Sequence, residues 1–110
     1  MNETYNVIYS PKALDDLREI YSYIAFTLKV PDTAKDQVNR IRKKIRSLDL
    51  MPLRYTLVDW EPWKSLEMHK LPIDNFIAYY TVNADSLIVT IIRIVYGGRD
   101  TDNIIKLENE

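Results

Sequence analysis

The spacing of apolar residues predicts two neighbouring helices in the first half of the chain. Between residues 11 and 28, apolar side chains recur every three or four positions, as on one face of a helix. Ser10 and Pro11 precede them, and these residue types favour the N-cap and the first helical position. The polar residues of this run, Asp16 among them, are expected on the outer face. A second run of the same period lies between residues 34 and 48, so close that we expect an antiparallel helix pair.

The second predicted helix is basic and has its own start signal. Thr33 and Asp36 have the spacing of a capping box at the beginning of the apolar run. The basic residues of the helix are Lys35, Arg40, Arg42, Lys43, Lys44 and Arg46. Such a run is either a solvated outer face or a patch that meets nucleic acid or an acidic segment of a partner.

Four segments rich in β-branched and aromatic residues predict strands. They are Thr4–Tyr9, Glu67–Pro72, Phe76–Val82 and Leu87–Tyr96. The last segment is apolar apart from Arg93, which predicts a strand in the middle of its sheet, buried on both faces. Short turns join the last three strands, so these should pair consecutively. The first strand is then expected at the free edge beside the fourth.

This order of elements predicts an α+β fold in which an N-terminal strand and a helical hairpin precede three further strands. The helical hairpin should pack on one face of a mostly antiparallel four-stranded sheet and leave the other face open. A short C-terminal helix is expected over Thr101–Leu107. The long segment Pro52–Leu66 holds Trp60 and Trp63, which either close the edge of the core or form a platform for a base or a partner side chain. We expect residues 1–110 to form a single domain.

Composition excludes several classes of function. An apolar fraction of 46% is typical of a globular domain, and no apolar stretch is long enough to span a membrane. Cysteine is absent and there is one histidine, so we expect no thiolate chemistry, no metal site and no cofactor. The first residues have no basic start followed by an apolar core, which favours a cytoplasmic protein.

Three residues near strand ends are candidates for chemistry. Arg99 follows the central strand and a glycine pair, where it is well placed to meet a phosphate or a carboxylate. His69 is the one side chain whose ordinary pKa lies near neutrality, so it is either a general acid or base or a structural histidine. Lys70 follows it directly, and alternation along a strand places the two side chains on opposite faces.

Four further residues are candidates for contact with RNA or another target. Arg93 needs either a place on the open face or a carboxylate partner, because it interrupts an apolar strand. Tyr96 either packs in the fold or stacks on a base. Arg54 and Lys64 belong to the long loop, where they can hold a phosphate backbone.

Three stretches, in this order, resemble the RelE/ParE superfamily of toxins from bacterial type II toxin–antitoxin systems, also known for plasmid stabilisation. They are YNVIYSPKALDDLREIYSYIA, HKLPIDNFIAYYTV and IVTIIRIVYGGRDTDNII, and together they cover nearly the whole chain. The resemblance implies two helices on a sheet and a cognate antitoxin that wraps the toxin and covers its open face. It also implies that contact with operator DNA is indirect, through the antitoxin.

The superfamily has two activities, and the resemblance leaves both open. RelE-like members enter the ribosome and cut mRNA without a metal, so the first hypothesis is a ribosome-dependent endoribonuclease that inhibits translation. By position, Lys70 and Arg99 match basic residues of RelE-like toxins, and His69 is a further candidate for the acid or base. Ile77 and Ile105 stand where those toxins have an arginine and a tyrosine. The alternative is a ParE-like inhibitor of DNA gyrase that has no nuclease activity.

Overall fold

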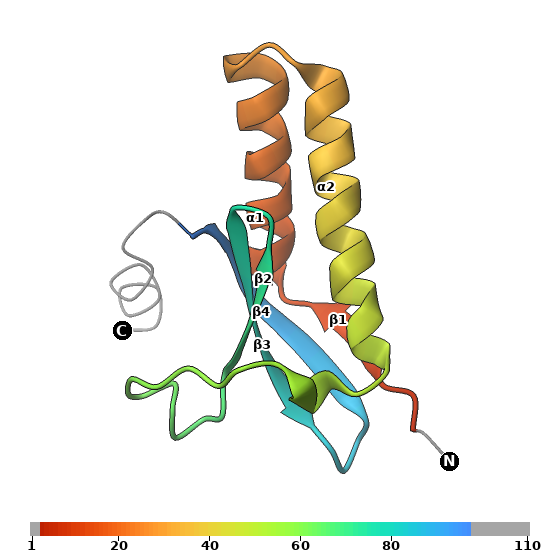
Figure 1. Ribbon diagram of the computed structural model, residues 1–110, viewed down its shortest axis with the longest axis vertical. Helices are drawn as coiled ribbons and strands as arrows, with labels where there is room; N and C mark the ends of the chain where they lie inside the picture. The colour runs from red at the N-terminus through yellow and green to blue at the C-terminus, as the bar shows by residue number, and fades with distance from the viewer. Residues whose placement is uncertain (1–2, 98–110) are drawn as a thin grey trace.

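Two helices pack on one face of a four-stranded sheet in the computed structural model, which describes residues 3–97 (Figure 1). The elements are β1 (Asn6–Tyr9), α1 (Pro11–Ser22), the π-helical turn η1 (Tyr23–Thr27), α2 (Pro31–Arg46), the short 3-10 turns η2 (Ser47–Asp49) and η3 (Pro52–Arg54), β2 (His69–Ile73), β3 (Phe76–Asn83) and β4 (Ile88–Tyr96). The predicted fold class is confirmed. The predicted helix over Thr101–Leu107 lies outside the described residues.

The sheet has the strand order β1-β4-β3-β2. β1 runs parallel to β4, whereas β3 runs antiparallel to both of its neighbours, β4 and β2. The prediction that the first strand occupies the edge beside a central fourth strand is therefore confirmed. A bulge interrupts the pairing of the two central strands, because Tyr79 is opposite Arg93 but Tyr80 is opposite Ile91, and Ile92 has no opposite residue in the register.

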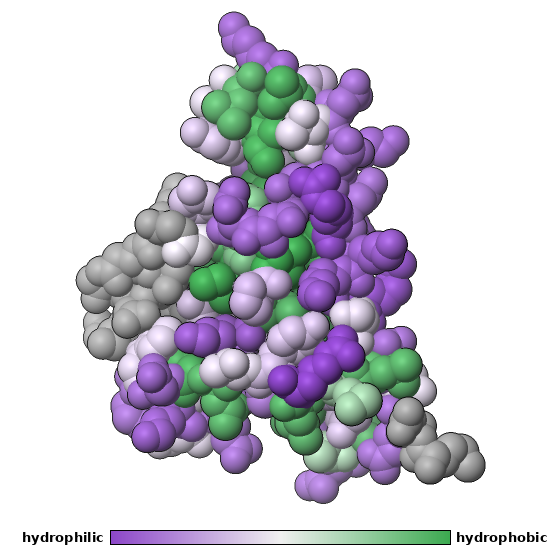
Figure 2. Space-filling view, viewed as in Figure 1, coloured by the Kyte–Doolittle hydropathy of each residue, from purple (hydrophilic) through white to green (hydrophobic). Residues whose placement is uncertain are grey.

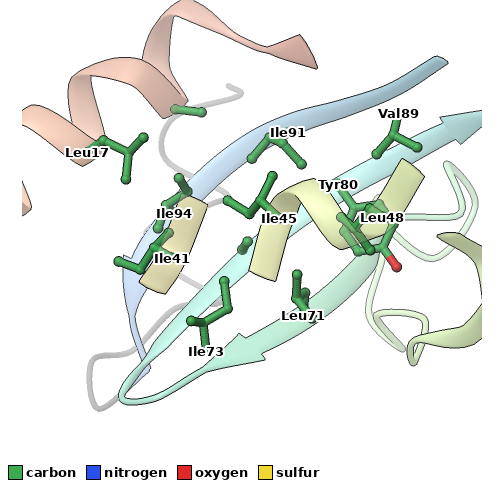
Figure 3. Close-up of a cluster of buried hydrophobic side chains, with 12 residues drawn as sticks. Leu17, Ile41, Ile45, Leu48, Leu71, Ile73, Tyr80, Val89, Ile91 and Ile94 are labelled. Carbon is green, nitrogen blue, oxygen red and sulfur yellow. The ribbon is translucent and has the colours of Figure 1, made fainter. Parts of the chain in front are cut away.

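The main core lies between the helices and the sheet. Ile41 and Ile45 of α2 and Leu48 of η2 are fully buried and point at the strands (Figure 3). From the sheet, residues such as Tyr80 and Ile91 complete this cluster. Since these positions follow the helical period of α2 and the alternation of the strands, the apolar pattern of the sequence predicts this half of the core.

Both helices differ from the prediction at their ends. α2 begins at Pro31 rather than at the predicted capping box, and no side chain caps its first turn. The capping-box prediction was wrong because proline is itself favoured at the first helical position, which puts Thr33 inside the helix. α1 passes into a π-helical turn, which closes with a bond from the Leu28 amide to the Tyr23 carbonyl, and Lys29 follows with φ of 60°.

Ser10 joins the start of α1 to the bulge in β4. Its hydroxyl oxygen accepts a hydrogen bond from the Ala13 amide at 3.0 Å, as an N-cap does. The same hydroxyl donates to the carbonyl of Ile92 at 2.9 Å, at the bulged residue itself. One side chain therefore both begins a helix and satisfies a carbonyl where the strand pairing is broken.

The Ser10→Ala variant is expected to lose about 2 kcal/mol of unfolding free energy, because one amide and one carbonyl lose their partner. Chemical denaturation followed by circular dichroism measures this loss. The Ser10→Thr variant keeps the hydroxyl and should recover most of the stability. Equal losses in both variants would contradict a role for these two hydrogen bonds.

Candidate functional site

The sheet face opposite the helices is partly covered, contrary to the expectation that it stays open. The segment after η3 folds back over it and brings Val58 and Trp63 against Met68, Tyr79 and Val95, all five of them buried. Backbone bonds fix the segment beside β2, from the Val58 amide to the Met68 carbonyl at 2.7 Å. The sequence offered closure of the core edge by Trp60 and Trp63 as one of two alternatives, but it did not predict that the loop covers this face, because an irregular segment has no period from which packing can be predicted. We call residues 55–68 the tryptophan loop.

Lys70 is the predicted site residue that reaches the surface of this covered face. Its ammonium lies 5.8 Å from the centre of the Trp60 ring, within the range of a cation–π interaction. Its amide donates to the Thr56 carbonyl at 2.9 Å, which ties the strand to the tryptophan loop. Trp60 and Trp63 thus take the predicted role of closing the core, while Trp60 also holds a cation. This pair offers one positive charge beside one aromatic ring.

His69 lies on the opposite face from Lys70, as strand alternation predicts. Only 5% of the residue is exposed, and its ring stacks on the Tyr80 ring with centroids 5.0 Å apart. Its Nδ1 lies 2.9 Å from the Tyr55 carbonyl oxygen. Because a carbonyl can only accept, this nitrogen carries the proton. The geometry favours the structural alternative for His69 over the predicted role of acid or base.

Arg93 has the carboxylate partner that the sequence left open as an alternative. Its Nε and one terminal nitrogen donate to the two oxygens of Asp16, at 2.8 and 3.0 Å. The amide of Ile94 donates to the same carboxylate at 2.9 Å. The expectation that Asp16 faces solvent was wrong, because this ion pair draws it against β4. A signal existed in the sequence, since Asp16 adjoins Leu17 at the border of the apolar face of α1.

Arg54 lies beside a hollow formed by the N-terminal segment and η3. The hollow has a volume of about 410 Å³ and its lining includes Tyr5, Met51 and Leu53. The Arg54 guanidinium lies 5.1 Å from the centre of the Tyr55 ring. This arginine is exposed and retains access to an anion.

The remaining predicted site residues are dispersed. Lys64 is exposed on the tryptophan loop. Tyr96 ends β4 and packs edge-on against Phe76, with ring centroids 5.8 Å apart. Lys70 is opposite Tyr79, which lies three residues after Phe76 in β3. Three residues correspond to about 10 Å along a strand, so Tyr96 and Lys70 are at different positions along the sheet. Arg99 lies outside the described residues. The structure therefore brings Lys70 together with Trp60, whereas His69 lies on the other face of the sheet and Tyr96 packs on Phe76.

Neither a metal centre nor a membrane segment is found in residues 3–97. This part of the chain has no group of three or more histidine, aspartate or glutamate side chains arranged to hold a metal ion. Neither α1 nor α2 is long and apolar enough to cross a membrane.

One family model and several solved structures match this chain. Residues 7–101 match the model of the ParE toxin of the type II toxin–antitoxin system parDE. A chain of the chromosomal ParDE system from P. aeruginosa has a similar structure, with a TM-score of 0.69, 22% identity, and coverage of 84% of this chain and 96% of that one. A chain of the archaeal RelE–RelB complex from Pyrococcus horikoshii OT3 has a TM-score of 0.60 and 17% identity over 87% and 98% of the two chains.

The toxin–antitoxin complex RelBE2 from Mycobacterium tuberculosis gives a TM-score of 0.61, with 16% identity and coverage of 86% of this chain and 92% of that one. At these identities the structural likeness shows a shared fold. Curated protein sequences give no significant match.

Proposed function

Because the chain belongs to the ParE toxin family of type II toxin–antitoxin systems, we propose that it inhibits DNA gyrase without cutting RNA. The observation that carries this proposal is the state of one predicted catalytic residue, His69, and one predicted target-contact residue, Arg93. His69 is buried with its Nδ1 engaged, and Arg93 is bound to Asp16. Metal-free RNA cleavage needs an acid, a base and cations around one phosphate. Of the two predicted catalytic residues that lie within residues 3–97, Lys70 is partly exposed and His69 is buried.

A cognate antitoxin is the expected partner, and within residues 3–97 the outer edge of β1 has no strand paired to it. At the other edge of the sheet, the tryptophan loop is bonded to the start of β2. An extended segment can add to the unpaired edge of β1 through main-chain hydrogen bonds. In a repressing complex, the operator sequence would be recognised by the antitoxin.

A ribosome-dependent endoribonuclease is the second candidate. The cation–π pair of Lys70 and Trp60 supports it, because it combines a charge for phosphate with a ring on which a base can stack. Arg99 would have to supply a further cation. This activity needs neither a metal nor a cofactor.

Gyrase supercoiling and cleavage on programmed ribosomes, measured with the same toxin preparation, separate the two candidates. We expect the toxin to abolish supercoiling and to leave ribosome-bound mRNA and free mRNA intact. Purified antitoxin should restore supercoiling. Cuts that appear only with ribosomes, and that Lys70→Ala or Arg99→Ala removes, would reject the gyrase proposal in favour of the nuclease. The exposed Lys29→Ala variant is the matched control for loss of one charge.

A further inference from the structure

Positive charge is concentrated on the C-terminal half of α2. Five of the seven residues from Arg40 to Arg46 are basic, and the other two, Ile41 and Ile45, are fully buried. All five basic side chains are exposed, and we call them the basic stripe. The rest of the chain carries ten basic and sixteen acidic residues, so the protein has a strongly uneven charge distribution despite its net charge of −1. The hydrophilic surface along α2 is visible on the right of Figure 2.

The stripe retains charges that no carboxylate neutralises. Arg40 is bound to Asp74 at 2.9 Å, and this bond, with one from Gln37, lowers the pKa of Asp74. In the described part of the chain, however, no carboxylate lies within ion-pair distance of Arg42, Lys43 or Arg46. These three side chains therefore remain available to an external anion.

Two neighbouring features widen the positive surface beyond the helix. Arg42 and Arg46 flank a hollow of about 130 Å³ that β1 closes with Val7 and Tyr9. On another side, Lys44 and Arg54 lie 5.9 and 5.1 Å from the centre of the Tyr55 ring. Both cations are exposed and lie within the range of a cation–π interaction with this one ring.

We propose that the basic stripe binds the phosphate backbone of duplex DNA. Along a helix axis, the stripe spans about 9 Å, since each residue rises about 1.5 Å. A DNA duplex carries about one negative charge per 1.7 Å of its axis, or about five charges over that length. Since Arg40 is bound to Asp74, the four other cations of the stripe supply nearly that number of opposite charges. Arginine, which provides three of the five, forms paired hydrogen bonds to phosphate oxygens.

The composition of the stripe favours DNA over an acidic peptide. Tight peptide recognition needs apolar or aromatic anchors inserted into pockets. Within Arg40–Arg46 both apolar side chains are fully buried, so the exposed surface of this segment consists of cations alone. A surface of this kind suits a ligand whose affinity comes from counterion release. The choice of DNA over other phosphate polymers rests on the proposed function, because gyrase acts while bound to DNA.

Fluorescence anisotropy of a labelled 20-base-pair duplex, measured over a range of salt concentrations, tests the proposal. The wild-type chain is compared with the triple variant Arg42→Gln, Lys43→Gln, Arg46→Gln, since glutamine preserves helix propensity. We expect the variant to bind on the order of 100-fold more weakly at about 0.1 M salt and the slope of log K against log salt to fall by about three. Circular dichroism confirms that each variant is folded.

The control variant removes the same charge elsewhere, through Arg18→Gln, Lys29→Gln and Lys35→Gln. All three positions are exposed and outside the stripe, and binding should stay within about threefold of wild type. Equal losses in both variants would show that net charge alone attracts DNA, and would overturn the proposal. No wild-type binding at low salt, or tighter stripe-dependent binding of a labelled polyglutamate peptide, would also overturn it. This assay contains no gyrase, so it tests DNA binding alone. Gyrase inhibition is measured in the separate supercoiling assay, and either proposal can therefore fail without the other.

Discussion

The Asp16→Ala variant is expected to lose about 3–5 kcal/mol of unfolding free energy, a large share of the stability of a small domain. The substitution leaves the Arg93 guanidinium without its carboxylate where the two side chains are only 11% and 9% exposed. It also removes the acceptor of the Ile94 amide. Since these bonds join α1 to β4, the loss should appear in global unfolding. Urea denaturation followed by circular dichroism measures it.

Two variants isolate the buried charge as the cause. Asp15→Ala breaks an ion pair with Arg18 whose side chains are 65% and 74% exposed, and should cost less than about 0.5 kcal/mol. The double variant Asp16→Leu, Arg93→Met removes both charges and should recover at least half of the stability lost by Asp16→Ala. A double variant as unstable as the single one would show that packing, rather than loss of the Asp16 charge beside Arg93, explains the lower stability.

The periodic parts of the sequence predicted most of the fold, and the ion pair shows where periodicity stops being informative. Apolar spacing located both helices, and the composition of β4 placed it in the interior of the sheet, as observed. The same reasoning predicted Asp16 on the outer face of the first helix, since burying a carboxylate without a partner is costly. Its partner is 77 residues away along the chain, and only the three-dimensional structure reveals that the two polar groups satisfy each other.

The candidate site was less predictable than the fold for a related reason. Lys70 and His69 were correctly separated onto two faces by alternation, but the surroundings of each depend on the tryptophan loop. The Tyr55 carbonyl of this loop accepts the hydrogen bond from His69, and the Trp60 ring of the loop lies beside Lys70. Irregular segments carry no repeating signal, so their packing follows from side-chain shape and hydrogen bonding instead. The resemblance to a family gave the residue types of the site but not their exposure.

The Trp63→Ala variant is expected to lose about 3–5 kcal/mol of unfolding free energy, because a large ring is removed from the cluster under the tryptophan loop. Trp63 is 5% exposed, and the cavity would border Tyr79 and Val95, which are buried at the sheet surface. The backbone bond from the Met68 amide to the Trp63 carbonyl persists in this variant, so the measured loss reports on the side chain. Thermal and urea unfolding both measure it.

The Trp63→Phe variant tests whether packing alone makes this contribution. The indole nitrogen of Trp63 is buried and has no hydrogen-bond partner within residues 3–97, so phenylalanine loses ring volume but no hydrogen bond. We expect a cost of about 1–2 kcal/mol, well below that of alanine. A cost equal to that of alanine would show that the indole makes an essential contact of another kind. With Trp63→Ala, limited proteolysis should cut the loop at rates above wild type, since the loop would then lose its main anchor on the sheet.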